Sequence, residues 1–233
     1  PYVEYQRVCP EVESGMSIPR PTIRLFGDFE KPRVVSSDGT MDVTDQLYSF
    51  SEQKLDQLSG LHGFIFMKKS PSCGLYSTKV YTEKGVHQKA RAGIFAEAVV
   101  RRYPNLPVEE DGRLNDPVLR ENFIARLFLY HRLRMLEDQG VTPRLLVEFH
   151  SSAKYFAMAY GPRLYKQLGQ IVAGAGVGDM EQVWRHYVSA FMVGTKKAPN
   201  HRGHSNVLYH LLGYLKKEVP SSFRQELAAA IEE

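Results

Sequence analysis

The first hundred residues alternate between short strand patterns and helical patterns. Four segments have the composition or the apolar–polar alternation of strands: Tyr2–Val8, Ile23–Gly27, Arg33–Val35 and Phe64–Lys68. Apolar residues recur at helical spacing after Asp42-Val43-Thr44, where Thr44 is the expected N-cap, and again over Gly93–Tyr103. Strands that alternate with helices predict a small α/β domain with a mostly parallel, Rossmann-like sheet.

The second half of the chain has helical patterns only. Residues 104–116 are rich in Pro and acidic residues and are predicted to form a linker. Asp116-Pro117 then has the sequence of a helix start. Four apolar stripes follow, made of Leu119, Phe123, Leu127 and Tyr130; Leu146, Phe149, Ala153 and Phe156; Val183, Tyr187 and Phe191; and Val207, Leu208, Leu211, Leu212 and Leu215. We predict an α/β domain over residues 1–108 and an all-α domain over 113–233.

Composition narrows the class of protein. The chain is 43% hydrophobic and 24% charged, which is ordinary for a soluble globular protein. It has no apolar run long enough to span a membrane and no signal-peptide pattern. Its two cysteines favour a reducing compartment, so we expect a cytoplasmic protein. Because the sequence begins without Met and within a strand pattern, we also expect an N-terminal piece to precede it.

Charge is distributed unevenly between the two halves. Residues 1–112 carry 14 basic and 15 acidic side chains, whereas residues 113–217 carry 15 basic and 7 acidic ones. A positive excess confined to one half suggests a polyanionic partner, of which nucleic acid is the commonest, although a solvated basic surface would have the same composition. The sequence indicates no protein partner.

Both cysteines follow strand patterns and enter Pro-containing loops. Cys9 lies in Val8-Cys9-Pro10-Glu11, and Cys73 lies in Ser70-Pro71-Ser72-Cys73-Gly74. Ligands of open α/β sheets collect at the carboxyl ends of the strands, so two thiols there, beside hydroxyls and a carboxylate, indicate a metal or catalytic site. Two unrelated buried thiols are the alternative. The CxxC pairs of a structural zinc site are absent, and a Cys–His nucleophile would need His62 or His87 nearby.

Several polar residues are candidates for anion or RNA binding. Arg20, between two prolines, can bind a phosphate or be an ordinary surface residue, and either Lys68 or Lys69 is expected to point at the cysteine loop. Near the C-terminus, Asn206, His210, Tyr214 and Lys217 recur on one helical face that suits RNA contacts. The remaining candidates are Arg120, Arg126, Arg132, Arg134, His150, Lys154, Arg202 and His204. His201 and His204 have no companion carboxylate or Cys that would favour a metal site.

An ordered series of motifs resembles a known family. Cys9-Pro10-Glu11-Val12-Glu13-Ser14-Gly15, Pro19-Arg20-Pro21, Asp42-Val43-Thr44 and Lys69-Ser70-Pro71-Ser72-Cys73-Gly74 resemble the thiouracil desulfidase (TudS) family. The second half resembles the helical domain of YbgA-like proteins. Its matching motifs are Leu119-Arg120-Glu121-Asn122-Phe123, Glu148-Phe149-His150-Ser151, Lys154-Tyr155 and Arg202-Gly203-His204-Ser205-Asn206-Val207-Leu208. The fused architecture is similar to RudS enzymes, which remove sulfur from 4-thiouridine in tRNA.

The resemblance implies a site and a cofactor. In that family three cysteines hold a 4Fe–4S cluster, so Cys9 and Cys73 would be two of the ligands. The family's third cysteine lies in an N-terminal Cys-Leu-Leu-Gly motif that is absent from this sequence, so we expect a cluster in the full-length protein and an incomplete ligand set here. The resemblance assigns acid–base catalysis to Glu11 and orientation of the base to Ser70, with Ser72 a second candidate or a cap of the loop. It also implies further C-terminal helices.

Three functions follow from this resemblance. The first is hydrolytic removal of sulfur from 4-thiouridine in tRNA, with the basic helical half holding the RNA. The second is desulfidation of free thiouracil or a thiolated nucleotide, and the third is a non-catalytic RNA-binding or iron–sulfur sensing module. The basic stretch favours tRNA, because a small neutral substrate needs no basic surface.

Overall fold

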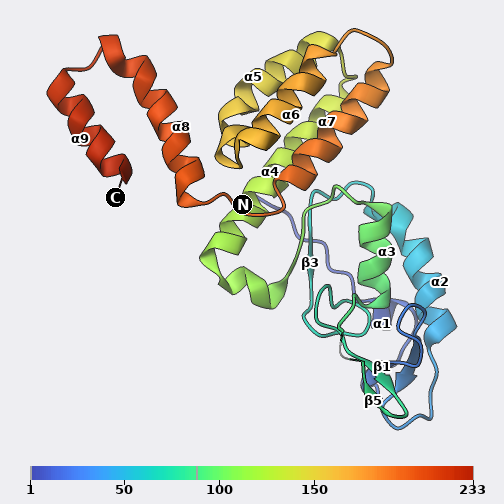
Figure 1. Ribbon diagram of the computed structural model, residues 1–233. Helices are drawn as coiled ribbons and strands as arrows, with labels where there is room; N and C mark the ends of the chain where they lie inside the picture. The colour runs from blue at the N-terminus through green and yellow to red at the C-terminus, as the bar shows by residue number, and fades with distance from the viewer. Residues whose placement is uncertain (1, 88, 233) are drawn as a thin grey trace. The chain divides into compact units, whose positions relative to one another are not determined.

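The computed structural model describes residues 2–87 and 89–232, which form two compact units, residues 1–123 and 124–233. The first unit mixes strands and helices, and the second is helical (Figure 1). The prediction of an α/β domain followed by an all-α domain is confirmed. The two units divide inside helix α4 (Pro117–Asp138), and the domain boundary expected near residues 108–113 stays a prediction.

The larger sheet of the first unit has the strand order β2-β1-β4-β5. Strand β1 (Ile23–Phe26) pairs antiparallel with β2 (Arg33–Ser36) and parallel with β4 (Val80–Thr82), and β4 pairs antiparallel with β5 (Gly85–Val86). The expectation of a mostly parallel sheet is therefore corrected to a mixed sheet. Residues 27–32 and 83–84 are too short to form the crossover that parallel neighbours need, so these pairs become hairpins.

A second, two-stranded sheet pairs β3 (Phe64–Phe66) in parallel with β6 (Val108–Glu110). The expectation of a linker over residues 104–116 is therefore wrong, because this segment contains β6 and the 3-10 turn η2 (Asp111–Asn115). Glu109 and Glu110 are buried, although acidic residues usually mark an exposed connection. Strand β6 pairs with β3, and Glu110 binds Leu75 and Tyr76, distant segments that local composition does not reveal.

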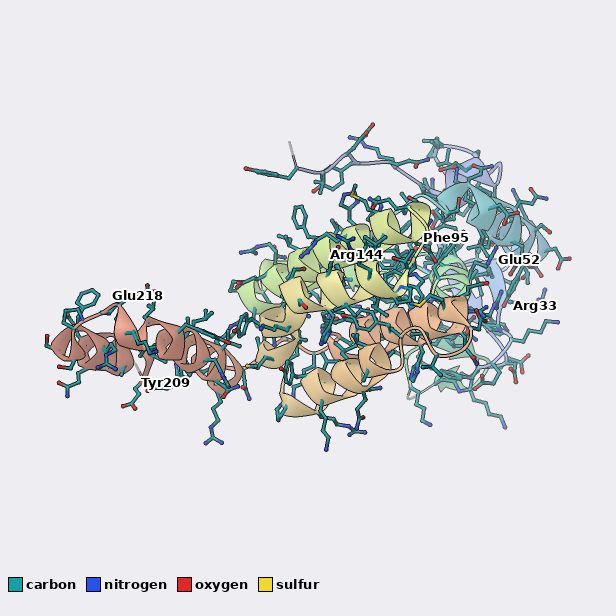
Figure 2. All side chains as sticks on the ribbon, turned by 90° about the horizontal axis from the view of Figure 1, so that it is seen from above. Arg33, Glu52, Phe95, Arg144, Tyr209 and Glu218 are labelled. Atoms are coloured by element: carbon teal, nitrogen blue, oxygen red, sulfur yellow. The ribbon has the colours of Figure 1, made fainter. Side chains whose placement is uncertain are left out.

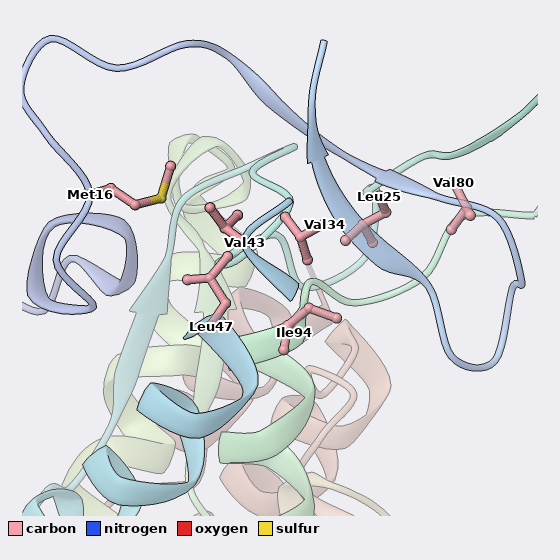
Figure 3. Close-up of a cluster of buried hydrophobic side chains, with 7 residues drawn as sticks. All are labelled: Met16, Leu25, Val34, Val43, Leu47, Val80 and Ile94. Atoms are coloured by element: carbon pink, nitrogen blue, oxygen red, sulfur yellow. The ribbon is translucent and has the colours of Figure 1, made fainter. Parts of the chain in front are cut away.

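Two helices form the core of the first unit together with these sheets. Helix α2 (Thr44–Leu55) continues into the 3-10 turn η1 (Asp56–Leu58) and packs beside α3 (Ile94–Arg102). One buried cluster joins the larger sheet to both helices (Figure 3), and it consists of Met16, Leu25, Val34, Val43, Leu47, Val80 and Ile94. Val43, not Thr44, is the N-cap of α2. The Thr44 hydroxyl instead accepts the Val34 N–H at 2.9 Å, which links the helix to β2.

The strand predicted at Tyr2–Val8 is wrong. Residues 2–8 have no regular secondary structure, and the rings of Tyr2 and Tyr5 are 95% and 78% exposed. A strand is stabilised by hydrogen bonds to a neighbouring strand, and among the described residues none pairs with this segment. Alternation of apolar and polar residues is therefore not sufficient to form a strand here.

The second unit continues α4 and adds five helices. They are α5 (Pro143–Ala159), α6 (Pro162–Ala173), α7 (Met180–Gly194), α8 (His201–Tyr214) and α9 (Ser221–Glu232), with the 3-10 turn η3 (Leu215–Lys217) after α8. Asp116 accepts the N–H groups of Val118 and Leu119 at 2.8 and 3.1 Å, as expected of an N-cap. Leu146, Phe149, Tyr187 and Phe191 are buried, which agrees with the second and third predicted stripes.

Helices α8 and α9 form a hairpin without a buried core. No described residue of either helix is buried, so the prediction of a buried fourth stripe from Val207 to Leu215 is wrong. Helix α8 packs against α5 and against α9. The hydroxyl of Tyr209, labelled in Figure 2, joins the two helices by donating to Ala228 O at 3.3 Å and to Glu232 Oε1 at 2.9 Å. Within the described residues, no helix has the length and apolar character required to cross a membrane.

Candidate active site

Cys9 and Glu11 are fixed by the short helix α1 (Pro10–Glu13). Cys9 is the N-cap, with extended backbone, and Pro10 begins the helix with the φ angle that helices require. The Glu13 carboxylate accepts the Cys9 N–H at 2.9 Å and pairs with Lys54 of α2 at 2.8 Å. This arrangement brings the Cys9 thiol to 3.4 Å from Glu11 Oε2.

The loop of the second cysteine reaches the other oxygen of the same carboxylate. Ser72 Oγ donates to Glu11 Oε1 at 2.5 Å and lies 3.5 Å from Cys73 Sγ. Ser70 Oγ lies 3.3 Å from Glu11 Oε1 and 3.0 Å from Ser72 Oγ, and it accepts the Cys73 N–H at 3.1 Å. The two thiols, two hydroxyls and one carboxylate that sequence analysis proposed thus form one hydrogen-bonded cluster.

The cysteine loop is held against the start of α3. The N–H of Ile94 donates to Pro71 O, and those of Phe95 and Ala96 donate to Ser72 O, at 3.0–3.1 Å. Gly93 is required by this close approach, because a Cβ atom there would lie 2.5 Å from Ser72 O. The backbone that carries Ser72 and Cys73 is therefore positioned by a helix terminus whose N–H groups would otherwise lack partners.

Electrostatics distinguishes the two thiols. Burial raises the pKa of Cys73 to about 12, the Ser72 hydroxyl opposes this shift, and the charges of Glu11 and Cys9 add to it. Arg20 lies 3.8 Å from Glu11 Oε2 and 4.0 Å from Cys9 Sγ, with its side chain 29% exposed. Its guanidinium partly compensates the negative charge of the cluster.

The cluster has the donor chemistry of an iron–sulfur site but not a full ligand set. Thiolates are the usual ligands of such clusters, and Cys9 and Cys73 flank one carboxylate. Across residues 2–87 and 89–232, no group of three or more His, Cys, Asp or Glu residues is arranged to hold a metal ion. Because both are thiols and lie beside the same carboxylate, Cys9 and Cys73 fit as two of the ligands of a cluster. The role of a third cysteine stays a prediction.

Lys68 and Lys69 directly precede Ser70 in the sequence and lie on the surface. Both are exposed, and the Lys68 N–H donates to Asp111 at 3.0 Å. Lys69 has a left-handed backbone with φ of 63°, which turns the chain just before Ser70. That either ammonium group serves the site stays a prediction. His87, considered as a partner for a nucleophilic thiol, instead contacts Gly27 O and Phe29.

Sequence analysis missed Glu109 and Glu110, which it placed in a linker. Glu110 is 1% exposed and accepts N–H groups from the segment that follows Cys73. Glu109 pairs with Arg113 at 2.8 Å. The available signal was Val108, which follows Pro107 and begins β6, but three residues are too few for a pattern of alternation to be recognised.

The predicted RNA-binding residues of the second unit differ in their surroundings. Arg202, His204, Asn206, His210 and Tyr214 are exposed on α8. The exposed Lys217 lies in η3, where the 3-10 geometry ends the helical series, so the single face predicted through Lys217 stops at Tyr214.

The other basic candidates are partly engaged within the protein. His150 Nδ1 lies 3.1 Å from Tyr187 Oη, and Lys154 Nζ lies 5.0 Å from the centre of the Tyr155 ring. The Arg120 guanidinium donates to Leu114 O at 2.8 Å, and Arg126 is buried. The Arg132 guanidinium lies 5.1 Å from the centre of the Phe149 ring. These side chains thus have contacts within the protein, and RNA binding by them stays a prediction.

Comparison with known proteins supports a two-part organisation. Residues 1–111 match the family described as 2-thiouracil desulfurase, and residues 154–233 match a protein family of unknown function, DUF1722. The chain is 31% identical to the uncharacterised protein YbgA of Escherichia coli (strain K12) over 113 residues, which are 48% of this chain and 67% of that protein.

A solved structure, that of the 4Fe-4S-dependent thiouracil desulfidase TudS, is also similar in sequence. The identity is 29%, and the match covers 46% of this chain and 68% of that one. Its TM-score of 0.35 is too low to support an argument from superposition. The family assignment therefore rests on the sequence matches. The chain belongs to the YbgA family and joins a 2-thiouracil desulfurase domain to a DUF1722 domain.

Proposed function

We propose that this protein is an iron–sulfur-dependent desulfidase that replaces the sulfur of 4-thiouridine in tRNA by oxygen, giving uridine. The observation that carries the proposal is the Glu11 carboxylate, which contacts Cys9 through one oxygen and Ser72 through the other. The family match over residues 1–111 supports desulfidase chemistry. The choice of tRNA as substrate rests on the charge of the second half.

Glu11 is the general base of the proposed reaction. Water adds to C4 of the thiocarbonyl, the C–S bond breaks, and the sulfur leaves as hydrogen sulfide, so that atoms balance without an oxidant or reductant. Glu11 takes the proton of the attacking water, and Ser72 and Ser70 orient its carboxylate through Oε1. The Arg20 guanidinium lies 3.8 Å from Glu11 Oε2, so a positive charge faces the carboxylate.

Cys9 and Cys73 would hold a 4Fe–4S cluster at this site. When bound, such a cluster supplies a Lewis-acidic iron for the departing sulfur. The protein contributes two thiols from segments 64 residues apart, and both segments are fixed by hydrogen bonds to α1 and α3. This prior fixation supports the assignment, because a ligand set held in place loses little conformational entropy on binding.

The basic second half is the proposed tRNA platform. Residues 113–217 carry 15 basic and 7 acidic side chains, and α8 exposes Arg202, His204 and His210 together with the ring of Tyr214. Cations bind phosphates, and exposed aromatic rings stack on unpaired bases. Affinity for tRNA is therefore expected to fall as salt rises. An Arg202→Ala variant is expected to reduce the salt slope by about one, the value for one phosphate contact.

Free 2-thiouracil is the second candidate substrate, because the matching family is described by that activity. A small neutral base would not need the basic half. If the reconstituted protein released sulfide from thiouracil but left tRNA unchanged, the second candidate would replace the first.

The test is an anaerobic reconstitution of the full-length protein, followed by measurement of 4-thiouridine in tRNA through its thione absorbance. We expect a loss of the thione band with release of one sulfide for each uridine formed. A protein with an intact cluster that changes neither tRNA nor thiouracil would favour a non-catalytic sensing module instead.

A further inference from the structure

Glu110 is a buried carboxylate outside the Glu11 cluster that binds the chain directly after Cys73. It is 1% exposed, and its Oε1 accepts the N–H of Leu75 at 2.8 Å and that of Tyr76 at 2.9 Å. The hydroxyl of Ser77 lies 3.4 Å from the same oxygen. One oxygen at the end of β6 therefore collects three donors from a segment more than 30 residues earlier in the sequence.

Leu75 is the buried one of the three residues that donate to Glu110, whereas Tyr76 is exposed and Ser77 is half-buried. Leu75 is 8% exposed, so its N–H has little access to water. A buried N–H without an acceptor is destabilising, and a bond to a charged acceptor is stronger than one to a neutral group. The Arg113 guanidinium pairs with the neighbouring Glu109 at 2.8 Å. Glu110 thus accepts N–H groups of the segment after Cys73, whereas Glu109 pairs with Arg113 and accepts the N–H of Glu110 at 2.9 Å.

The cysteine loop is consequently anchored on both sides of Cys73. On the N-terminal side, α3 binds the carbonyls of Pro71 and Ser72. On the C-terminal side, Glu110 binds the N–H groups of residues 75 and 76. Between the anchors, Gly74 approaches Ser70 and Thr78 so closely that a Cβ atom would lie 2.1 Å from Thr78 Oγ1. A loop anchored on both sides has few conformations available for its central thiol.

We propose that Glu110 is a positioning residue for the Cys73 thiol, which it fixes through the backbone N–H groups of residues 75 and 76. The inference rests on the proposed function only in giving Cys73 a role as a cluster ligand. The hydrogen bonds that carry it do not depend on that role. Removing the carboxylate frees the C-terminal side of the loop, so the Cys73 thiol becomes accessible and loses its fixed place beside Ser72.

The test compares alkylation of the two cysteines by iodoacetamide in the cluster-free, reduced full chain, with each site quantified by mass spectrometry at one pH. In Glu110→Ala we expect Cys73 to react at least tenfold faster than in the unsubstituted protein, while the rate at Cys9 changes less than twofold. Glu110→Gln retains a carbonyl acceptor of the same shape and is expected to restore slow labelling of Cys73.

Glu109→Ala is the matched control, because it removes a buried carboxylate from the adjacent position of the same strand. It is expected to leave the labelling of Cys73 within twofold of the unsubstituted protein.

Unchanged labelling of Cys73 in a folded Glu110→Ala, or equal acceleration at Cys9 and Cys73, would overturn the proposal. If Glu110→Ala does not fold, Ser77→Ala and Glu110→Asp are compared by hydrogen exchange of residues 74–78. The proposal is supported if residues 74–78 keep full protection in Ser77→Ala and lose protection at least tenfold in Glu110→Asp. Full protection of these residues in Glu110→Asp contradicts it.

Turnover separates this inference from the proposed function. If the reconstituted protein desulfurates tRNA, Glu110→Ala is expected to lower kcat and cluster content while KM stays within twofold. If no variant has desulfidase activity but Cys73 labelling changes as described, the proposed function fails and the positioning role stands.

Discussion

The cysteine loop of the first unit and helix α8 of the second carry the two most distinctive motifs of the chain, but they are built differently. The loop has no regular secondary structure, yet Ser72 and Cys73 are buried and the backbone is bound by α3 and Glu110. Helix α8 is regular and has an Asn200 N-cap, yet none of its described residues is buried. Regular secondary structure is thus a poor guide to where the rigid part of this protein lies. The loop suits chemistry that needs fixed distances, and α8 suits a surface for a large partner.

Substitution of Glu11 should have the largest effect and tests whether the loop is a catalytic site. Glu11→Gln retains the acceptor for Ser72 but removes the base, so desulfidation is expected to fall at least about 100-fold. The measurement is the loss of the thione absorbance per cluster. Glu13→Gln, in the same short helix, is the control and should retain most activity, because the amide oxygen still provides an acceptor for the Cys9 N–H. Equal losses in both variants would mean that α1 is only structural.

Gly93 tests whether the loop is rigid because of its contact with α3. A Cβ atom there would lie 2.5 Å from Ser72 O, so Gly93→Ala should lower the free energy of unfolding by about 1–3 kcal/mol. Urea unfolding measures this change. Gly60→Ala, at a position with no atom within 4 Å of the added carbon, should leave stability nearly unchanged. An unchanged free energy of unfolding in Gly93→Ala would show that the loop adapts to the added carbon and is not rigid.

Gly203 tests how α8 is attached. Its added Cβ atom would lie 2.0 Å from Ala159 O at the end of α5, so Gly203→Ala should separate α8 from α5. Because α8 has no buried core to lose, we expect faster proteolysis of the α8–α9 segment and a change of less than about 1 kcal/mol in the main unfolding transition. Gly213→Ala, on the same helix with open space around it, should be neutral or stabilising by up to about 1 kcal/mol. Similar behaviour of both variants would contradict the assigned contact.

The smallest expected effect is the pH dependence of stability that comes from His150 of α5. Burial lowers the pKa of His150, and the charge of Lys154 adds to this shift. The folded state therefore binds fewer protons than the unfolded state near the ordinary histidine pKa, so stability rises with pH across that range and falls on acidification. His150→Asn should flatten this dependence when urea midpoints are compared at pH 5 and 7. An unchanged slope would assign the dependence to other groups.

Local sequence was sufficient where a helix is determined by its own residues. The Asp116-Pro117 start of α4 and the apolar stripes of α5 and α7 follow from capping chemistry and helical spacing. The motif residues of the candidate site, Cys9, Glu11, Ser70 and Ser72, were also identified in advance, and the structure brings them together.

Only the tertiary structure decided the pairing of distant segments. Tyr2–Val8 has the alternation of a strand but no strand partner among the described residues, whereas Val108-Glu109-Glu110 forms a strand because β3 is available to pair with it. Strand formation depends on hydrogen bonds to another segment, which no local pattern contains. The sequence by itself identified the candidate side chains of the site and the start of α4. The fold decided that one carboxylate lies between two thiols and that a second, Glu110, holds the loop, because both arrangements join residues more than 30 positions apart.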